Sequence, residues 1–217
     1  MNMKETIIRF LDQVGIRTSY VKRKMKQYDY HKIQLREWEN AGKPVPPPHI
    51  VKQQVITEYQ KQYQYKTLVE TGTYLGEMVD AQLNNFERIY SIELGEDLWK
   101  AAVKKFEKYP YIDILQGDSG TVLKSIVPKL NTPAIFWLYG HYSAGVTAKG
   151  EKECPIYEEL QAIFTSKINH VLLIDDARCF NGTGDYPSIK DLSAFILSNR
   201  PDSKIEVKDD VIRVECR

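Results

Sequence analysis

Three carboxylates stand where short apolar segments of this sequence end: Glu70, Glu93 and Asp118. An ionised carboxylate only accepts hydrogen bonds, and its two oxygens can hold two hydroxyl groups at once. If the apolar segments are parallel strands, their carboxyl ends border the crevice in which open α/β sheets bind ligands. The three acids together therefore predict a binding site for a ligand with hydroxyl and amino groups, although each acid alone is more typical of a solvated loop.

A glycine loop follows the first of these acids, in the segment Glu70–Gly76. Gly72 permits a tight turn, and Gly76 is expected to let the next helix pack close to the sheet. Between them, Thr73 and Tyr74 bring backbone amides towards a ligand at a helix N-terminus. A dinucleotide fingerprint has a different glycine spacing. The loop therefore favours a nucleoside that carries a sulfonium and no pyrophosphate, and a glycine turn without a ligand is the alternative.

The next two acids extend this prediction. Glu93 comes 17 residues after Gly76, and a carboxylate at a strand end can accept both hydroxyls of a ribose. Asp118, followed by Ser119, stands where a carboxylate could accept from the amino group of an adenine. The order of the three acids predicts a nucleoside site along three successive strands.

The elements that position these residues alternate between strand and helix. The apolar segments are Thr67–Thr71, Arg88–Glu93, Ile112–Gln116, Ala134–Leu138 and His170–Ile174. A plausible helix follows each segment, and this alternation predicts parallel strands joined by crossover helices. Ile205–Val207 and Val211–Glu215 are too close for a crossover, so they should be antiparallel. We predict an α/β fold with a Rossmann-like, mostly parallel sheet of seven strands and a C-terminal antiparallel pair.

The N-terminal part of the chain has a different character. Its apolar residues have helical spacing, with a second helix expected from about Ser19 to Glu39 and a third from about Ile50 to Tyr63. Between these two helices, the proline-rich run Gly42–Pro48 is a stretch that no helix could cross. We predict a helical appendage and linker over residues 1–48 and a ligand-binding domain over residues 49–217.

Composition limits the function classes. The chain has 217 residues, of which 42% are hydrophobic and 27% charged, and its net charge is +1. This balance indicates a globular protein without the basic surface of general nucleic-acid or membrane binders. Three cysteines, an odd number without metal-type spacing, fit a reducing cytoplasm. We expect a cytoplasmic protein with no nucleic-acid or membrane partner, and with N-terminal helices that shape an acceptor site or a homodimer contact.

The motifs resemble those of a known family over about residues 43–215. Glu70–Gly76, Ile92-Glu93 and Gly117-Asp118 are similar to the S-adenosylmethionine (SAM) motifs of class I methyltransferases. Tyr74 within the glycine motif is similar to the catechol and caffeoyl-CoA O-methyltransferases. Phe136–Lys149 and Leu173–Arg178 resemble an uncharacterised bacterial group of the family. The resemblance implies SAM as cofactor and methylation as the reaction. We interpret the methyl acceptor as a hydroxyl group of a small-molecule or glycan-type compound.

Methyl transfer requires an aligned acceptor and a group that takes its proton. His141 follows the fourth apolar segment, and an ordinary histidine pKa suits a general base, although a structural histidine is an equal alternative. Asp175 and Asp176 follow the fifth segment and complete the predicted catalytic residues.

The aspartate pair also suggests a metal. The resemblance implies that metal-dependent relatives hold a divalent ion with such a pair and an acid after the fourth strand. Tyr139 stands in the place of that acid, and a neutral phenol is a poor ligand for Mg²⁺. Three roles therefore stay open for Asp175 and Asp176: Mg²⁺ binding, acceptor binding, or an ion pair with Arg178.

Tyr139 also motivates a second functional hypothesis, a SAM-binding protein with weak or no catalysis that acts as a binding or assembly module. A nicotinamide-dependent dehydrogenase is disfavoured because the glycine spacing differs from the dinucleotide fingerprint.

Overall fold

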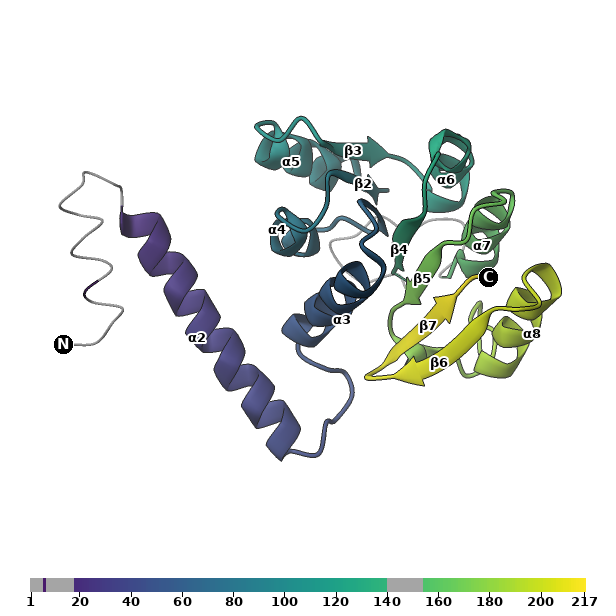
Figure 1. The fold of residues 1–217 in the computed structure, drawn as a ribbon, viewed down its shortest axis with the longest axis horizontal. Coiled ribbons are helices and arrows are strands. Elements are labelled where there is room, and N and C mark those ends of the chain that lie inside the picture. The colour runs from purple at the N-terminus through teal and green to yellow at the C-terminus, as the bar shows by residue number, and fades with distance from the viewer. Residues whose placement is uncertain (1–5, 7–17, 140–153) are drawn as a thin grey trace. The chain divides into compact units, whose positions relative to one another are not determined.

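The computed structural model describes residue 6, residues 18–139 and residues 154–217 (Figure 1). The chain divides into two compact units, Met1–Val51 and Lys52–Arg217. Among the described residues, no helix has both the length and the apolar character that a membrane crossing requires.

The first unit contains the long helix α2 (Thr18–Asn40). The helix ends where the amide of Ala41 donates to the carbonyl of Glu37, and Gly42 follows with a left-handed φ of 80°. This conformation is common just after a helix and favours glycine. The indole of Trp38 donates to the carbonyl of Pro44 at 2.8 Å, which fixes the start of the proline run. The prediction of a helix before residue 18 falls outside the described residues.

The second unit contains a seven-stranded sheet of order β3-β2-β1-β4-β5-β7-β6. Its strands are β1 (Thr67–Thr71), β2 (Arg88–Glu93), β3 (Ile112–Gln116), β4 (Ala134–Leu138), β5 (Val171–Ile174), β6 (Lys204–Lys208) and β7 (Val211–Glu215). Every pairing among β1–β5 is parallel, whereas β7 runs antiparallel to both of its neighbours. The predicted fold class is confirmed.

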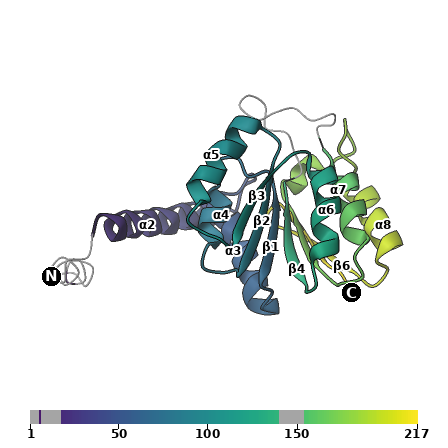
Figure 2. The same cartoon turned by 90° about the horizontal axis from the view of Figure 1, so that it is seen from above.

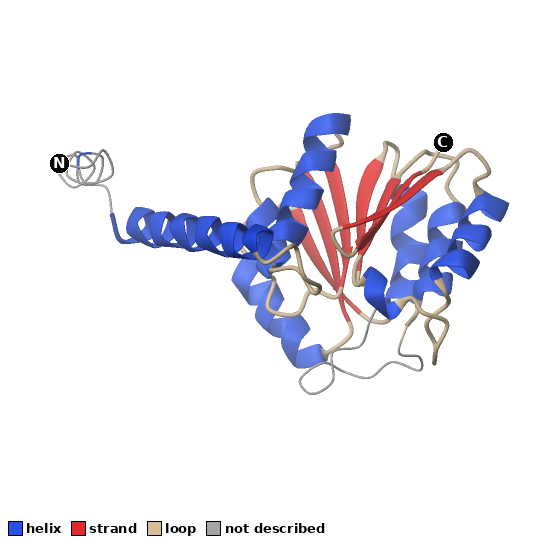
Figure 3. Ribbon diagram, turned by 90° about the horizontal axis from the view of Figure 1, so that it is seen from below, coloured by secondary structure: helices blue, strands red, loops and turns tan. Residues whose placement is uncertain are grey.

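Helices cover both faces of the sheet (Figures 2 and 3). One face packs against α3 (His49–Tyr63), α4 (Glu77–Gln82) and α5 (Glu96–Phe106), and the other against α6 (Ser119–Ile126), α7 (Ile156–Phe164) and α8 (Ile189–Asn199). Neighbouring residues of one strand serve opposite faces: Leu68 belongs to the first core and Val69 to the second. Such strands are apolar on both sides, which explains the continuous apolar segments of the sequence.

Two details refine the predicted boundaries. The hairpin between β6 and β7 turns through Asp209 and Asp210, both with left-handed φ (51° and 63°), as a tight two-residue turn requires. The fifth strand starts at Val171, one residue later than predicted. The side chain of His170 before it is buried, and its Nδ1 accepts from the amide of Ala134 at 3.1 Å. Burial lowers the pKa of His170 to about 4, so this histidine is neutral and structural.

Candidate active site

The glycine loop after β1 is anchored to the neighbouring strand. The amides of Gly72 and Thr73 both donate to the carbonyl of Ile92 in β2, at 2.8 and 3.1 Å. Gly72 and Tyr74 have left-handed φ values of 84° and 49°, which reverse the chain between β1 and α4. The prediction that Gly72 permits a tight turn is confirmed by this geometry.

The reason for glycine at position 76 differs from the predicted one. A Cβ added to Gly76 would lie 2.6 Å from Cε2 of Phe106, a ring of α5. The close approach is therefore between the loop and α5, and not between the helix and the sheet. Lys105 of α5 holds the same corner, since its Nζ donates to the carbonyl of Leu75 at 2.8 Å and pairs with Asp80 at 2.6 Å.

Glu93 links the loop to the end of β2. Its Oε2 accepts from the amide of Tyr74 at 2.7 Å, and its Oε1 accepts from the amide of Gly95 at 2.9 Å. The residue is buried, with 4% of its surface exposed. Each carboxylate oxygen has two lone pairs, so one amide on each oxygen leaves capacity for a further donor. Glu93 therefore keeps the capacity to accept two hydroxyls.

Glu70 and Thr73 point into the protein interior. Ser91 of β2 donates to Glu70 Oε2 at 2.6 Å, and the Thr73 hydroxyl lies 2.7 Å from the same serine oxygen. Burial raises the pKa of Glu70 to about 8; the charge of Glu93 adds to this rise, while Ser91 and Lys105 oppose it. The two residues form a buried polar chain beneath the loop.

Asp118 and Ser119 sit at the start of α6 and have structural partners. Asp118 is exposed and caps the helix, since its Oδ1 accepts from the amide of Thr121 at 3.0 Å. The Ser119 hydroxyl donates to Glu159 of α7 at 2.6 Å. Burial raises the pKa of Glu159 to about 7. Sequence reasoning missed this glutamate, although an acid between Ile156 and Leu160 on an apolar helix face is a signal.

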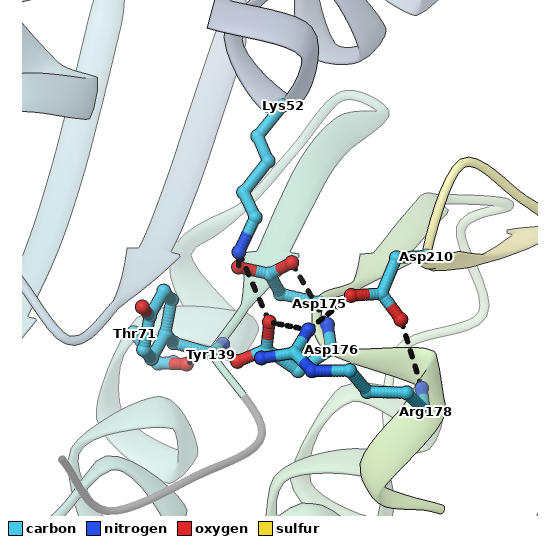
Figure 4. A network of polar contacts seen from close by, with 7 residues as sticks. All are labelled: Lys52, Thr71, Tyr139, Asp175, Asp176, Arg178 and Asp210. Carbon is cyan, nitrogen blue, oxygen red and sulfur yellow. Dashed lines mark hydrogen bonds and ion pairs between the residues drawn. The ribbon is translucent and has the colours of Figure 1, made fainter. Parts of the chain in front are cut away.

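A dense ion cluster lies at the end of β5 (Figure 4). Lys52 reaches in from α3, and its Nζ lies 2.7 Å from Asp175 Oδ2 and 3.0 Å from Asp176 Oδ1. Both aspartates are fully buried. Burial by itself would lower the pKa of Lys52, but the two aspartates outweigh it and raise the pKa above its ordinary value. The amine is therefore held as an ammonium ion.

Arg178 completes the cluster. Its NH1 lies 2.7 Å from Asp176 Oδ1 and also pairs with Asp210 of the β6–β7 turn. The backbone amide of Arg178 donates to Asp210 as well, at 2.9 Å. The alternative that the aspartates pair with Arg178 is thus observed for Asp176. Two side-chain cations face three carboxylates at this end of the sheet.

Tyr139, the residue after β4, contacts both the end of β1 and the ion cluster. Its amide donates to the Thr71 hydroxyl at the end of β1 (3.0 Å), and its ring lies 5.6 Å from Lys52 Nζ. Burial raises the pKa of its phenol, so the side chain is neutral. Tyr139 therefore brings an aromatic ring, and no negative charge, to the aspartate pair.

The described residues at this end do not fit a divalent metal ion. The ammonium of Lys52 already occupies the space between Asp175 and Asp176, and Tyr139 offers no carboxylate. Within residues 18–139 and 154–217, no cluster of three or more His, Cys, Asp or Glu side chains could hold a metal. His141 lies outside the described residues, so its role as a base stays a prediction.

Lys52 is the principal residue that sequence reasoning missed. It shares the buried face of α3 with Val55, Ile56 and Tyr59. A lysine is almost never buried unless it is paired, so a lysine within an apolar helical stripe is the signal that could have found it.

No family model matches the chain, and the search of curated proteins gives no match. Its fold is similar to solved methyltransferase structures. They include an O-methyltransferase from Bacillus cereus in complex with S-adenosylhomocysteine (SAH; 14% identity, 99% of this chain and 100% of that chain, TM-score 0.56). A second is the O-methyltransferase TomG from Streptomyces achromogenes, involved in tomaymycin synthesis and in complex with SAM (14% identity, 100% of this chain and 99% of that chain, TM-score 0.55). A third is the SAH-bound methyltransferase PaMTH1 of Podospora anserina (13% identity, 93% of this chain and 97% of that chain, TM-score 0.54). The fold is thus that of the class I methyltransferases, as the motif resemblance predicted.

Proposed function

We propose that this protein is a SAM-dependent methyltransferase that methylates a hydroxyl group of a small-molecule or glycan-type acceptor. The observation that carries the proposal is the geometry of Glu93. Its carboxylate stands at the carboxyl end of β2, is fixed by the amides of Tyr74 and Gly95, and keeps acceptor capacity. This is the place where open α/β sheets bind ligands.

The residues at the ends of β1, β2 and β3 fit SAM. Glu93 would accept the ribose hydroxyls, the free capacity of the exposed Asp118 suits the adenine amino group, and the loop Gly72–Gly76 would border the methionine part. Glu70 lies buried beneath the loop, and a cationic ligand nearby would favour the ionised form of its carboxyl group. When bound, SAM supplies a methyl group on a sulfonium. Ser119 and Thr73 would act indirectly, because their hydroxyls are engaged by protein groups.

The acceptor end of the site must align a hydroxyl and remove its proton. Burial raises the pKa of Asp175, but Lys52 and Arg178 engage both aspartates, so these carboxylates are less available to an acceptor proton than an unpaired base would be. We therefore assign proton removal to His141, which follows β4 in the sequence. The likeness in fold to two proteins described as O-methyltransferases supports a hydroxyl acceptor.

Calorimetric titration tests the cofactor. We expect the full chain to bind SAM and SAH and not NAD, and NAD binding without SAM binding would contradict the proposal. A panel of small-molecule and glycan hydroxyl acceptors, with SAH release as the readout, then tests the reaction. SAM binding without turnover on any acceptor would favour the alternative of a binding or assembly module.

A further inference from the structure

The ammonium group of Lys52 has the surroundings that a bound cation would have. Two carboxylate oxygens, Asp175 Oδ2 and Asp176 Oδ1, lie within 3.0 Å of it, and the ring of Tyr139 lies 5.6 Å away. Anionic oxygens and aromatic rings both attract cations. Figure 4 shows the lysine side chain extending from α3 to a position above the aspartate pair.

The three charges are interdependent because all are buried. Lys52 is 7% exposed, and both aspartates are 0% exposed. A buried charge without its partner is strongly unfavourable. Lys52 and the two aspartates, which lie 123 and 124 positions away in the sequence, therefore stabilise one another.

A divalent ion between the aspartates would need the same oxygens. Mg²⁺ sits at roughly 2.0–2.1 Å from its oxygen ligands, which would place it in contact with the Lys52 ammonium. The two positive charges would repel each other, and Asp176 Oδ1 is already shared with Arg178. An ion could bind only if the ammonium left.

We propose that Lys52 is the built-in cation of this site: its ammonium takes the place between Asp175 and Asp176 that a divalent metal ion would need, and makes the site independent of metal. Lys52 is a positioning residue, since it holds the end of β5 through the two aspartates that follow this strand. The expectation that methyl transfer needs no metal rests on the proposed function. The effect on metal binding does not, because it requires neither SAM nor an acceptor.

The test is an Mn²⁺ titration of the full chain. Calorimetry and the paramagnetic signal of free Mn²⁺ measure the binding. Lys52→Met removes the ammonium and keeps an unbranched side chain, so the aspartates become available. We expect this variant to bind Mn²⁺ at least about tenfold more tightly than the wild type, because affinity follows ligand charge. Lys52→Arg keeps the cation and should show no gain. Asp175→Asn added to Lys52→Met should abolish the gain.

Thermal unfolding supplies a second readout. We expect the melting temperature of Lys52→Met to rise with millimolar Mg²⁺, and that of the wild type to be unchanged by Mg²⁺ or by EDTA. A Lys52→Met chain that folds only with a divalent ion would also support the proposal. A folded Lys52→Met chain with wild-type Mn²⁺ affinity would overturn it.

Mn²⁺ binding to the wild type tests the proposal even where Lys52→Met does not fold. Wild-type Mn²⁺ binding that disappears in Asp175→Asn would overturn the proposal, and insensitivity to Mg²⁺ and EDTA would support it. A failure of SAM binding would contradict the proposed function without affecting these Mn²⁺ results.

Discussion

The two halves of the site at the strand ends give their carboxylates different kinds of partner. At the ends of β1 and β2, Glu70 and Glu93 are met by a serine hydroxyl and by backbone amides. At the ends of β4 and β5, Asp175 and Asp176 are met by the side-chain cations of Lys52 and Arg178. Neutral donors leave the charge of Glu93 available to a ligand, whereas the paired cations offset much of the charge of the aspartates.

The difference corresponds to two kinds of ligand. Burial raises the pKa of Glu70 to about 8, so a cationic ligand nearby would favour its ionised form. SAM carries such a positive charge. In the other half the charges are largely balanced within the protein, which suits a neutral hydroxyl acceptor. The two halves thus match the two substrates of the proposed reaction, and the following variants test that division.

The largest expected effect is on turnover. His141→Ala should lower methyl transfer by about 10²–10⁴-fold if His141 is the general base. Wild-type turnover should persist in EDTA and should fall at a pH low enough to protonate the His141 imidazole, because a protonated imidazole cannot take a proton. SAH release measures both effects, with His49→Ala as the histidine control. Full activity of His141→Ala, or activity that EDTA abolishes, would contradict this assignment.

The next effect is on stability in the ion-paired half. Asp175→Asn should lower the free energy of unfolding by about 3 kcal/mol, because it removes the carboxylate nearest to the buried Lys52 ammonium. Urea denaturation at pH 7 measures the change. Glu87→Gln is the matched control, since it breaks the exposed pair with Lys66 and should cost less than about 1 kcal/mol. An Asp175→Asn effect as small as the control would show that the pairing contributes little.

The same exchange in the other half should have the opposite sign. Burial raises the pKa of Glu70 from 4.5 to about 8 in the folded chain. Between these values the folded state holds a proton that the unfolded state has lost, so stability falls as pH rises, by up to about 1.4 kcal/mol per pH unit. Glu70→Gln should remove this contribution and stabilise the protein near pH 8.

Urea denaturation at pH 5, 6.5 and 8 measures the difference between Glu70→Gln and the wild type. Glu107→Gln, an exchange at the exposed C-terminal end of α5, serves as the control. A constant difference across the three pH values would contradict the buried-acid assignment of Glu70.

A smaller effect concerns the cofactor itself. Glu93→Ala should weaken SAM binding by about 1–3 kcal/mol, roughly tenfold or more, because the ribose hydroxyls lose their acceptor. Calorimetry measures the affinity, and circular dichroism checks the fold. Asp97→Ala, which removes an exposed acid from the first turn of α5, should bind SAM as the wild type does. Unchanged affinity in Glu93→Ala would end the assignment of this site.

The smallest effect on SAM binding is expected from truncation. We propose that residues 1–48 shape the acceptor site or a homodimer contact and contribute nothing to SAM binding. A chain that begins at His49 keeps Lys52 and should bind SAM with wild-type affinity, while turnover or self-association is lost. Calorimetry, SAH release and light scattering separate these outcomes. Unchanged turnover and unchanged oligomeric state would leave the appendage without either role.

The sequence by itself determined the fold and one half of the candidate site. Apolar segments that alternate with helices predicted the parallel strands, and the short link before Val211 predicted the antiparallel pair. The loop Gly72–Gly76 and the strand-end acid Glu93 were found because turn geometry and strand ends leave local signals. These features depend on residues close together in the chain, so periodicity and spacing are sufficient to predict them.

Only the tertiary structure decided which residues face one another. Periodicity indicates that Lys52 and Glu159 lie on buried helix faces, but not that they meet Asp175 and Ser119. The close contact of Gly76 with Phe106 is of the same kind. The pairing of Lys52 with Asp175 joins residues 123 positions apart, and it forms because helix α3 packs across the sheet where β5 ends. A buried ammonium is stable only beside its carboxylates, so the fold, and not the local sequence, converts an apparent metal site into an internal ion pair.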